Sequence, residues 1–419
     1  MSEKTSQDAA PLAGLKVVDF SRVLAGPLCS RTLLDLGADV TKVEPPMGDV
    51  TRYAAPTNGA MSGYYAQQNS GKRNVCLDLN VPAAREVALR LCDDADIVVE
   101  NFRAGALASF GLDYESVAAR NPRIIYCSIT GYGQGGPWRS RMAYAPTVQA
   151  EAGFTATSEA HYGDTLTAPA TDSLSHADVY AGLQGVIAIL AALHARERTG
   201  QGQYIDVAMA ATLLAVNEKA HLALSGLDIG DEPPVLGATD CPFFTGPEGE
   251  RLIVATSLTG SLTYRFFLSA MRRADLAKDP RFATAADRRK NLGELHAIVQ
   301  RWIDGFPNKR ALDAQFDEAK IAMGEVRTIE QLAASEWADY WGATLQVPDR
   351  EGGEYTLPGR PWRFSHSALD QPGVPALQGE HNAAICEELG FSDAEIDALR
   401  NARGLLAPRP PGLKAAAEK

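Results

Sequence analysis

Residues 178–206, Asp-Val-Tyr-Ala-Gly-Leu-Gln-Gly-Val-Ile-Ala-Ile-Leu-Ala-Ala-Leu-His-Ala-Arg-Glu-Arg-Thr-Gly-Gln-Gly-Gln-Tyr-Ile-Asp, predict one long apolar helix followed directly by a strand. A carboxylate, Asp178, lies in the first helical turn, and basic residues lie in the last, so both ends suit the helix dipole. Gly200 gives the helix its end, and the strand begins at Gln203.

Local pattern leaves two roles open for Asp178. An acid at this position commonly caps the free N–H groups of the first helical turn. The same N–H groups could instead hold a carboxylate that acts as a nucleophile. The choice between a cap and a catalyst depends on the rest of the chain.

Bulk properties exclude several classes of protein. The chain has 419 residues, enough for two domains with full cores, and a net charge of −12 without a basic, aromatic-rich patch, which argues against nucleic-acid binding. The longest apolar run, 186–193, is too short to cross a bilayer, and the N-terminus lacks a signal-peptide pattern. Six scattered cysteines without a Cys-x-x-Cys pair predict reduced thiols in the cytoplasm, and the histidines lack metal-ligand spacing.

The first half of the chain alternates between strand and helix patterns. Strands are expected at 15–20, 39–44, 73–79, 96–102, 123–129 and from 204, with helices after residue 25 and over 82–93. This β-α-β alternation predicts an α/β fold with a Rossmann-like parallel sheet. The Gly-x-Gly-x-x-Gly fingerprint is absent after the first strand, which disfavours NAD or FAD. The turn at 23–27 exposes backbone groups at a helix start and could bind a nucleotide-bearing ligand.

The pattern changes in the second half. Residues 142–173 are expected to form a loop, 208–224 a helix, 226–241 a linker, 242–255 a hairpin, 263–272 and 292–306 amphipathic helices, 351–364 strand and turn, 382–403 terminal helices, and the tail after 406 no regular structure. A small α+β domain is therefore expected over 225–327, after a large domain over 1–224.

Motifs in a fixed order carry a resemblance to a known family. They include Gly-Ala-Asp-Val-Thr-Lys-Val-Glu at 37–44, Glu-Asn-Phe-Arg at 100–103, Gly-Tyr-Gly at 131–133, Arg-Thr-Gly-Gln-Gly-Gln-Tyr at 198–204, Asp-Pro-Arg-Phe at 279–282 and Gly-Glu-His at 379–381. Together they resemble the class III CoA-transferases, the formyl-CoA transferase and carnitine-CoA transferase superfamily, over nearly the whole chain.

The resemblance implies a fold, an assembly and a substrate. The large domain would be built from both chain ends, with 328–419 returning to it, and two subunits would interlock as a homodimer. CoA and its acyl thioesters would be substrates, together with a carboxylic acid, and no tightly bound cofactor or metal would be needed.

The family nucleophile is an aspartate at the start of the helix that leads to the Arg-x-Thr-Gly-x-Gly-Gln segment, and Asp178 occupies that position. The resemblance therefore implies that Asp178 attacks the thioester and carries anhydride and aspartyl-CoA thioester intermediates. Asp164 and Asp172 lie too far upstream to match.

Positions that match the family's CoA contacts are Leu24, Ala25, Leu77, Asn80, Asn101, Phe102, Arg103, Arg141 and Tyr144. Two positions depart from the family, because Pro45 and Ser109 stand where other members have arginine. Arg103 and Lys72 are therefore expected to hold the CoA phosphates. Arg141 could alternatively pair with a substrate carboxylate or be a surface charge.

The main alternative is an α-methylacyl-CoA racemase on the same fold, which uses a His–Asp acid/base pair. Tyr144 occupies the position of the racemase histidine, and neither His161 nor His176 matches it, so transfer is favoured. Leu236 to Asp240 differ from the glycine-rich loop of formyl-CoA transferase, which weakens formyl/oxalate exchange and leaves both acids unidentified.

Overall fold

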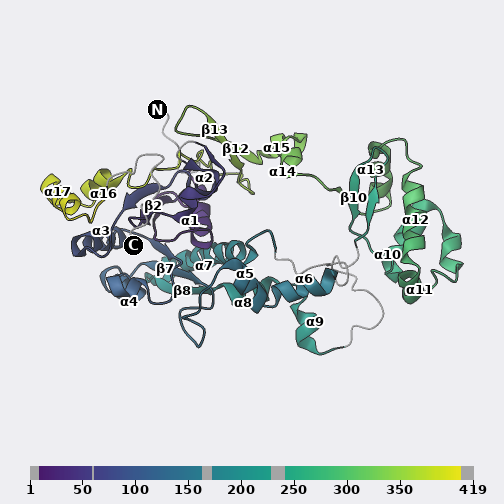
Figure 1. Ribbon diagram of the computed structural model, residues 1–419, viewed down its shortest axis with the longest axis horizontal. Helices are drawn as coiled ribbons and strands as arrows, with labels where there is room; N and C mark the ends of the chain where they lie inside the picture. Colours follow the sequence, from purple (N-terminus) through teal and green to yellow (C-terminus); the bar gives the residue numbers. More distant parts are fainter. Residues whose placement is uncertain (1–8, 59–60, 163–171, 228–240, 407–419) are drawn as a thin grey trace. The chain divides into compact units, whose positions relative to one another are not determined.

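A computed structural model describes residues 9–58, 61–162, 172–227 and 241–406. The chain divides into two compact units, a large unit of residues 1–218 and 340–419 and a small unit of residues 219–339. Figure 1 shows the elements of each unit, coloured along the sequence. The boundaries expected from the sequence, after residues 224 and 327, stay a prediction.

The large unit contains a six-stranded parallel sheet. Its strands are β1 (Lys16–Asp19), β2 (Asp39–Glu44), β5 (Arg73–Cys76), β6 (Ile97–Glu100), β7 (Ile125–Thr130) and β8 (Gln203–Ala208), in the spatial order β5-β2-β1-β6-β7-β8. This is the Rossmann strand order. Successive strands are added on one side of β1 and then, from β6 onward, on its other side, so the switch point of the strand order lies between β1 and β6. The predicted α/β fold with a parallel sheet is confirmed.

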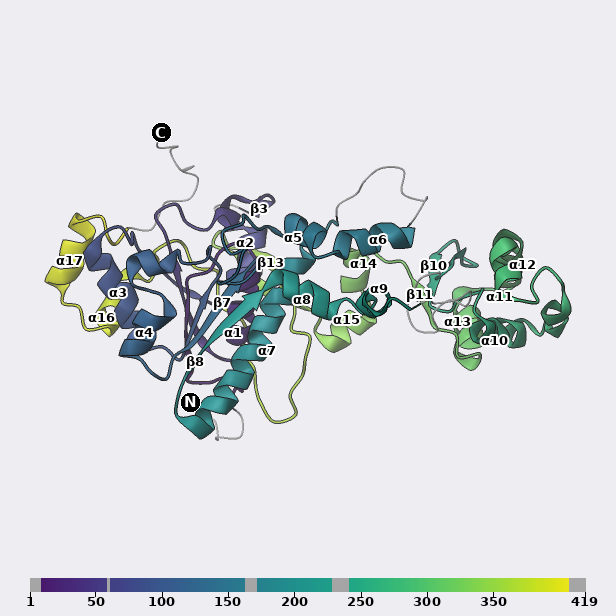
Figure 2. The same cartoon turned by 90° about the horizontal axis from the view of Figure 1, so that it is seen from below.

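Helices cover both faces of this sheet. Alternate residues of a strand point to opposite faces, so they pack into two different hydrophobic cores. Val17 and Val99 belong to the core that contains α1 (Ala25–Asp35), α5 (Ala145–Glu151), α7 (His176–Thr199) and α8 (Met209–Val216). Val18 and Val98 belong to the other core, with α3 (Pro82–Asp93), α4 (Tyr114–Arg120), α16 (Asn382–Glu388) and α17 (Asp393–Asn401). Figure 2 shows the sheet with α1 and α7 and, farther along it, α3 and α4.

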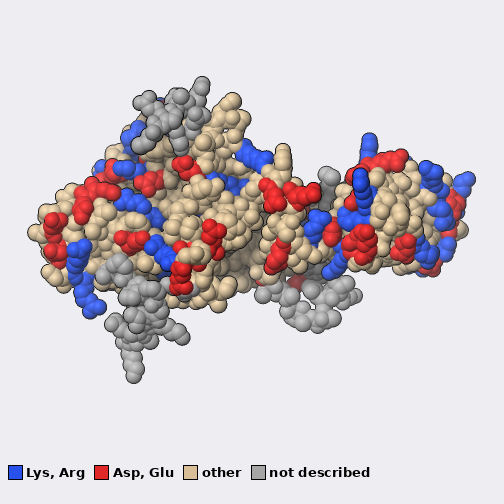
Figure 3. Space-filling model, turned by 90° about the horizontal axis from the view of Figure 1, so that it is seen from above, with Lys and Arg blue, Asp and Glu red and all other residues tan. Residues whose placement is uncertain are grey.

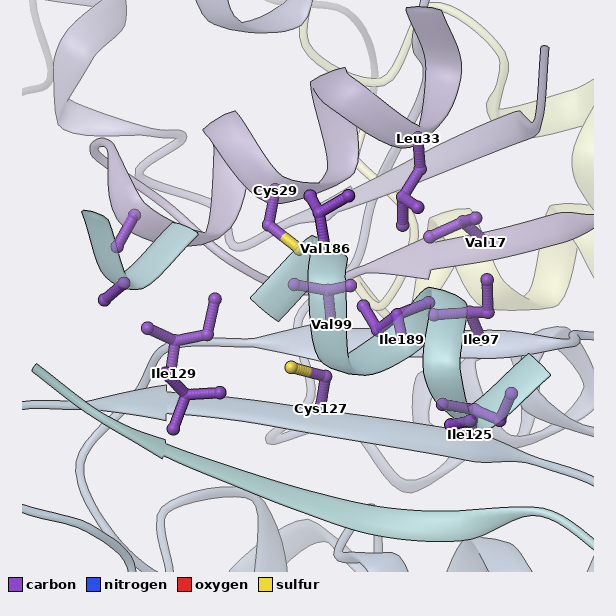
Figure 4. Close-up of a cluster of buried hydrophobic side chains, with 14 of the residues drawn as sticks. Val17, Cys29, Leu33, Ile97, Val99, Ile125, Cys127, Ile129, Val186 and Ile189 are labelled. Atoms are coloured by element: carbon purple, nitrogen blue, oxygen red, sulfur yellow. The ribbon is translucent and has the colours of Figure 1, made fainter. Parts of the chain in front are cut away.

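The helix α7 packs very closely against α1. A Cβ added at Gly182 would lie 2.6 Å from the carbonyl oxygen of Ala25, and one at Gly185 would lie 3.2 Å from the Cys29 sulfur. Figure 4 shows Cys29 and Leu33 of α1 near Val186 of α7, above the strands. By length and composition α7 could span a membrane, but a core helix meets the same criterion, and its residues Ala181 and Ile189 are fully buried.

Two sequence expectations in this region are wrong. The expected loop at 142–173 contains α5 and α6 (Phe154–Tyr162), because Thr147 Oγ1 accepts the Tyr144 N–H at 3.1 Å and the alanine-rich sequence favours helix. The expected helix at 208–224 is interrupted at Asn217, which adopts extended backbone between α8 and α9 (Ala220–Ser225). Most of the expected linker at 226–241 and the tail after 406 lie outside the described residues.

The C-terminal segment returns to the large unit. The hairpin of β12 (Thr344–Pro348) and β13 (Glu354–Pro358) packs beside α2 (Gly63–Asn69), where Leu357 and Tyr65 share a small core. Farther along, the His381 N–H donates to the Asn74 carbonyl at 3.0 Å, and α16 lies beside β5. The strand and turn predicted at 351–364 are confirmed, and of the one or two terminal helices expected over 382–403 two form, α16 and α17.

The small unit has its own core and its own sheet. The predicted hairpin forms as β9 (Phe243–Thr245) and β10 (Arg251–Val254), and β11 (Met323–Glu325) pairs with the other side of β10. The predicted amphipathic helices correspond to α10 (Ser261–Met271) and α12 (Leu292–Ile303). In the chain, α11 (Ala285–Lys290) lies between them, and α13 (Lys309–Glu318) follows α12. Acidic and basic side chains are mixed over the described surface seen in Figure 3.

Candidate active site

A pocket of about 340 Å³ lies where the carboxyl ends of β6 and β7 meet the starts of α1, α5 and α7. The place agrees with the general rule that open α/β sheets bind ligands at the switch point of their strand order. The residues that line it are Arg22, Val23, Leu24, Val50, Tyr64, Asn101, Phe102, Arg103, Ala104, Ile129, Thr130, Gly131, Tyr132, Arg139, Arg141, Met142, Ala143, Tyr144, Ala145, Pro146, Ser175, Asp178 and Met209.

Asp178 lies in the first turn of α7, and its carboxylate also faces the start of α1. The Ala25 N–H, from the first residue of α1, donates a hydrogen bond to it. Burial raises the pKa of Asp178 to about 6, and the Ala25 hydrogen bond opposes part of that rise. Sequence reasoning assigned the stabilising N–H groups to the helix of Asp178 itself, whereas this hydrogen bond comes from a different helix.

Six residues predicted to contact CoA line this pocket together with Asp178: Leu24, Asn101, Phe102, Arg103, Arg141 and Tyr144. Ala25 contributes its backbone N–H. The polar atoms of Asn101 are already engaged, because its amide oxygen accepts from Arg22 N at 2.9 Å and its amide nitrogen donates to Arg22 O at 2.8 Å. Asn101 therefore fixes the backbone of the turn before α1 as well as lining the pocket.

Lys72 does not reach the pocket, and its assignment as a phosphate anchor is contradicted by its surroundings. The side chain is 3% exposed, and its ammonium lies 2.9 Å from Asp19 Oδ2, 2.8 Å from Ser30 Oγ and 2.9 Å from Asn69 Oδ1. Burial lowers the pKa of Lys72 to about 8, although Asp19 opposes the shift. The sequence shows Lys72 as a cation at the start of a strand, but in the structure its ammonium is buried and pairs with Asp19 in the interior.

Leu77 and Asn80 also lie away from the pocket lining. Leu77 is buried and forms a β-bridge with Leu405, while the exposed Asn80 hydrogen-bonds the carboxylate of Asp78. Both follow β5, which is separated from β6 by two other strands.

Among the lining residues that sequence reasoning missed are Arg22, Arg139 and Tyr64. Arg22 lies over the Phe102 ring at 5.1 Å, and neither Arg22, Arg103 nor Arg139 forms an ion pair with any described residue. Arg141, in contrast, contacts Glu151 at 2.6 Å. Arg22 could have been found from its position beside the turn at 23–27, but no sequence signal singled out Tyr64.

The Tyr64 phenol faces both the nucleophile candidate and a buried acid. Burial raises the pKa of Tyr64, and the charges of Asp178 and Asp49 raise it further. At neutral pH it is therefore a neutral hydroxyl that can donate a hydrogen bond beside Asp178.

A second cavity, of about 460 Å³, adjoins the pocket and shares Arg103, Ala104 and Arg139 with it. Its buried acid is Glu100, which accepts from the Phe102 N–H at 2.8 Å and from Gln134 Nε2 at 3.0 Å. Burial raises the pKa of Glu100 to about 7, with a smaller contribution from Asp206.

Among the described residues, no group of three or more His, Cys, Asp or Glu side chains could hold a metal ion. The chemistry available at the pocket is that of a partly desolvated carboxylate beside backbone donors, a phenol and several guanidinium groups.

Comparisons with known proteins agree on one family. The family model described as CoA-transferase family III matches residues 12–382. The chain is 33% identical to a succinate–glutarate CoA-transferase of Agrobacterium fabrum, covering 90% of this chain and 96% of the relative. It is 30% identical to a formyl-CoA:oxalate CoA-transferase of Streptomyces avermitilis, covering 93% and 98%. Among solved structures it is similar to a CAIB/BAIF family protein from Brucella suis, with a TM-score of 0.73, 34% identity and coverage of 91% and 100%.

Proposed function

The chain belongs to CoA-transferase family III, and we propose from this that it moves CoA from an acyl thioester to a carboxylic acid through covalent intermediates on Asp178. The observation that carries the proposal is the carboxylate of Asp178, which lines a pocket at the switch point and accepts the Ala25 N–H.

In the first half of the reaction, a carboxylate oxygen of Asp178 attacks the thioester carbonyl, and the C–S bond breaks to give a mixed anhydride and CoA thiolate. The thiolate then attacks the Asp178 carbonyl of the anhydride. This releases the first carboxylic acid as its carboxylate and leaves CoA on Asp178 as a thioester.

In the second half, the acceptor carboxylate attacks the aspartyl thioester and expels the thiolate again. The thiolate attacks the acceptor's carbonyl in the new anhydride, which forms the product thioester and regenerates Asp178. Each step exchanges one acyl bond for another, so electrons and protons balance without a redox cofactor.

The pocket suits each step. With a pKa of about 6, Asp178 is ionised at neutral pH, and its partial burial strips away part of the water that would weaken its nucleophilicity. The Ala25 N–H and the Tyr64 hydroxyl are donors that could stabilise the oxyanions of the tetrahedral intermediates.

We propose that CoA contacts Leu24, Ala25, Asn101, Phe102, Arg103, Arg141 and Tyr144, with Arg22 and Arg139 as additional cations for its anionic groups. The exposed guanidinium groups of Arg22, Arg103 and Arg139 support this, because charged hydrogen bonds to phosphate are their usual role. Leu77 and Asn80 stay a prediction for the far end of CoA, outside this pocket.

We propose small acids as donor and acceptor, with dicarboxylates tested first. The relatives are named for succinate, glutarate, formate and oxalate, and the unpaired arginines of the pocket could hold a second carboxylate. We place the reaction in the cytoplasm, which suits cysteines that form no disulfide bond with one another.

We propose that the chain acts as an interlocked homodimer, as its family membership implies. One face of α7 supports this, because Leu183, Ile187 and Leu190 are exposed there at helical spacing. The domain division at 224 and 327 belongs to the same proposal. Sedimentation equilibrium should give a dimer for the native chain, and Ile187→Glu should weaken it.

Mass spectrometry tests the nucleophile. The protein is incubated with succinyl-, glutaryl-, formyl- and oxalyl-CoA, quenched and digested, and the peptide with Asp178 should carry a CoA or acyl adduct. Asp178→Asn should lose the adduct and turnover, while the nearby exposed Asp172→Asn should keep both. Full activity of Asp178→Asn would refute the proposal, and α-hydrogen exchange with D₂O without an acceptor acid would indicate a racemase instead.

A further inference from the structure

The turn that connects β1 to α1 delivers the Ala25 N–H to Asp178, and side chains hold its backbone at every step. Ser21 N donates to Asp19 Oδ1 at 2.8 Å, and Ser21 O accepts from Lys42 Nζ at 2.6 Å. Asn101 binds both the N–H and the carbonyl of Arg22. Because β1, β2 and the segment after β6 each supply one of these partners, the turn is fixed by tertiary structure and not by its own sequence.

Val23, the next residue, has φ = +69°, in the left-handed region. This conformation is costly for a β-branched side chain and persists only when its surroundings impose it. The Val23 N–H points to the carboxylate of Asp49, at 3.2 Å from Oδ2 and 3.3 Å from Oδ1. Asp49 is therefore the group that holds the strained residue two positions before Ala25.

Asp49 is itself held rigidly. It is 1% exposed, and its Oδ1 accepts from Thr51 N at 3.0 Å and from Thr51 Oγ1 at 2.8 Å. The Lys42 ammonium, fully buried, lies 3.3 Å from Oδ2. Burial alone would raise the pKa of Asp49, but Lys42 and Thr51 hold it below its usual value, so the carboxylate stays ionised.

Charge balance explains how this buried group is tolerated. Lys42 also lies 4.0 Å from Asp19, which contacts Lys72 at 2.9 Å. Two carboxylates and two ammonium groups thus form a buried cluster of zero net charge below the turn, where each ion has opposite charges nearby.

We propose that Asp49 is a positioning residue of the transfer reaction: by holding Val23 in the left-handed conformation, it directs the Ala25 N–H at Asp178. Asp49 is not among the residues that line the pocket. The inference rests on the proposed role of Asp178 as nucleophile, and it adds a residue on which that role depends.

Asp49→Asn is the first test. The side chain keeps its shape but places an amide group against the Lys42 ammonium or the Val23 N–H, so the turn should relax. We expect kcat to fall on the order of tenfold, since small displacements of catalytic groups have such effects, while KM for the acyl-CoA changes less than about twofold. Weakening of the Ala25 hydrogen bond should also move the acidic limb of the pH–rate profile upward by about half a pH unit.

Glu44→Gln is the matched control. Glu44 lies on the same strand as Lys42, is 1% exposed and forms a buried ion pair with Arg52 at 2.9 Å, but it makes no contact with the turn. It should lower the melting temperature without moving the acidic limb. A purely structural role for Asp49 would give both variants the same profile.

Adding Val23→Gly to Asp49→Asn gives a rescue test, because glycine adopts φ = +69° without strain. The double variant should recover several-fold in kcat over Asp49→Asn alone. Thr51→Val, which removes one hydrogen bond to Asp49, is the milder variant to use if Asp49→Asn fails to fold, and it should move the limb in the same direction.

The rate of adduct formation on Asp178, measured by quenched flow and mass spectrometry, separates this inference from the proposed function. Absence of any adduct in the native protein would refute the nucleophile. An adduct that forms in Asp49→Asn at the native rate, with an unmoved acidic limb, would overturn the positioning role alone. A double variant no faster than Asp49→Asn would also overturn it.

Discussion

Replacing Asp178 with asparagine should stabilise the protein while it abolishes activity. Burial holds the pKa of Asp178 at about 6 against an ordinary value of 3.8, so the folded protein binds the proton more tightly than the unfolded chain. Stability therefore falls as pH rises from 3.8 to 6, and the full cost applies above 6. About 2 pKa units correspond to roughly 3 kcal/mol.

Two features reduce that figure. Asp178 is only partly buried and faces the pocket, where water screens its charge, and asparagine retains an oxygen that can accept the Ala25 N–H. We therefore expect Asp178→Asn to gain roughly 1–2 kcal/mol at pH 8, with about half of the gain remaining at pH 5.

Urea unfolding at pH 8 and pH 5 measures this gain, and Asp172→Asn, at an exposed acid, is the control that should change little at either pH. A variant no more stable than the native protein at pH 8, or a gain that is larger at pH 5, would contradict the reasoning. Such trade-offs between activity and stability are common where a charged group is held in a partly dry site.

Three further outcomes follow from the site. The kcat/KM of the native enzyme should fall about tenfold per pH unit below pH 6, because only ionised Asp178 attacks the thioester; a flat profile between pH 4.5 and 6 would count against it. Gly182→Ala should lower kcat on the order of tenfold, since its Cβ would lie 2.6 Å from the Ala25 carbonyl and force α1 outward, while Gly293→Ala, in an open helical position, should be neutral or stabilising; equal activities would refute this packing. Glu100→Gln should reduce the loss of stability between pH 5 and pH 8 by roughly 2 kcal/mol, because burial raises the pKa of Glu100 to about 7 and the folded state loses that proton in this range; thermal unfolding at both pH values would show an unchanged difference if the inference is wrong.

Much of the fold was predictable from the sequence. The strands β1, β6 and β7 are short, mainly apolar runs, and α3 begins at a proline. The bounds expected for β2 and α3 are the observed ones. The two boundary errors have local causes, a cap at the start of α5 and extended backbone at Asn217. The loop expected before α7 forms helices, and α8 ends at Asn217 although the apolar pattern continues.

The site was predictable in part. Asp178 and six of the expected CoA contacts share one pocket because they lie at motif positions near the ends of adjacent strands. The expectation that Lys72 lies beside the other CoA contacts was not met, because nothing in the sequence distinguishes a buried lysine paired with Asp19 from a solvated one. The contact between Ala25 and Asp178 joins residues far apart in the chain, and the conformation of Val23 has no sequence signature.

The segment at residues 381–382 completes the edge of the sheet that β5 forms. β5 is the edge strand, and its open side is occupied by the C-terminal segment: Asn382 Oδ1 accepts the Cys76 N–H at 2.9 Å, and His381 Nδ1 accepts the Asn74 N–H at 3.1 Å. During synthesis the open side of β5 stays unpaired until residues 381 and 382 have been made. The small unit is formed by contiguous residues 219–339 and can therefore fold earlier. A chain truncated before residue 381 would therefore leave the open side of β5 unpaired and prone to aggregation.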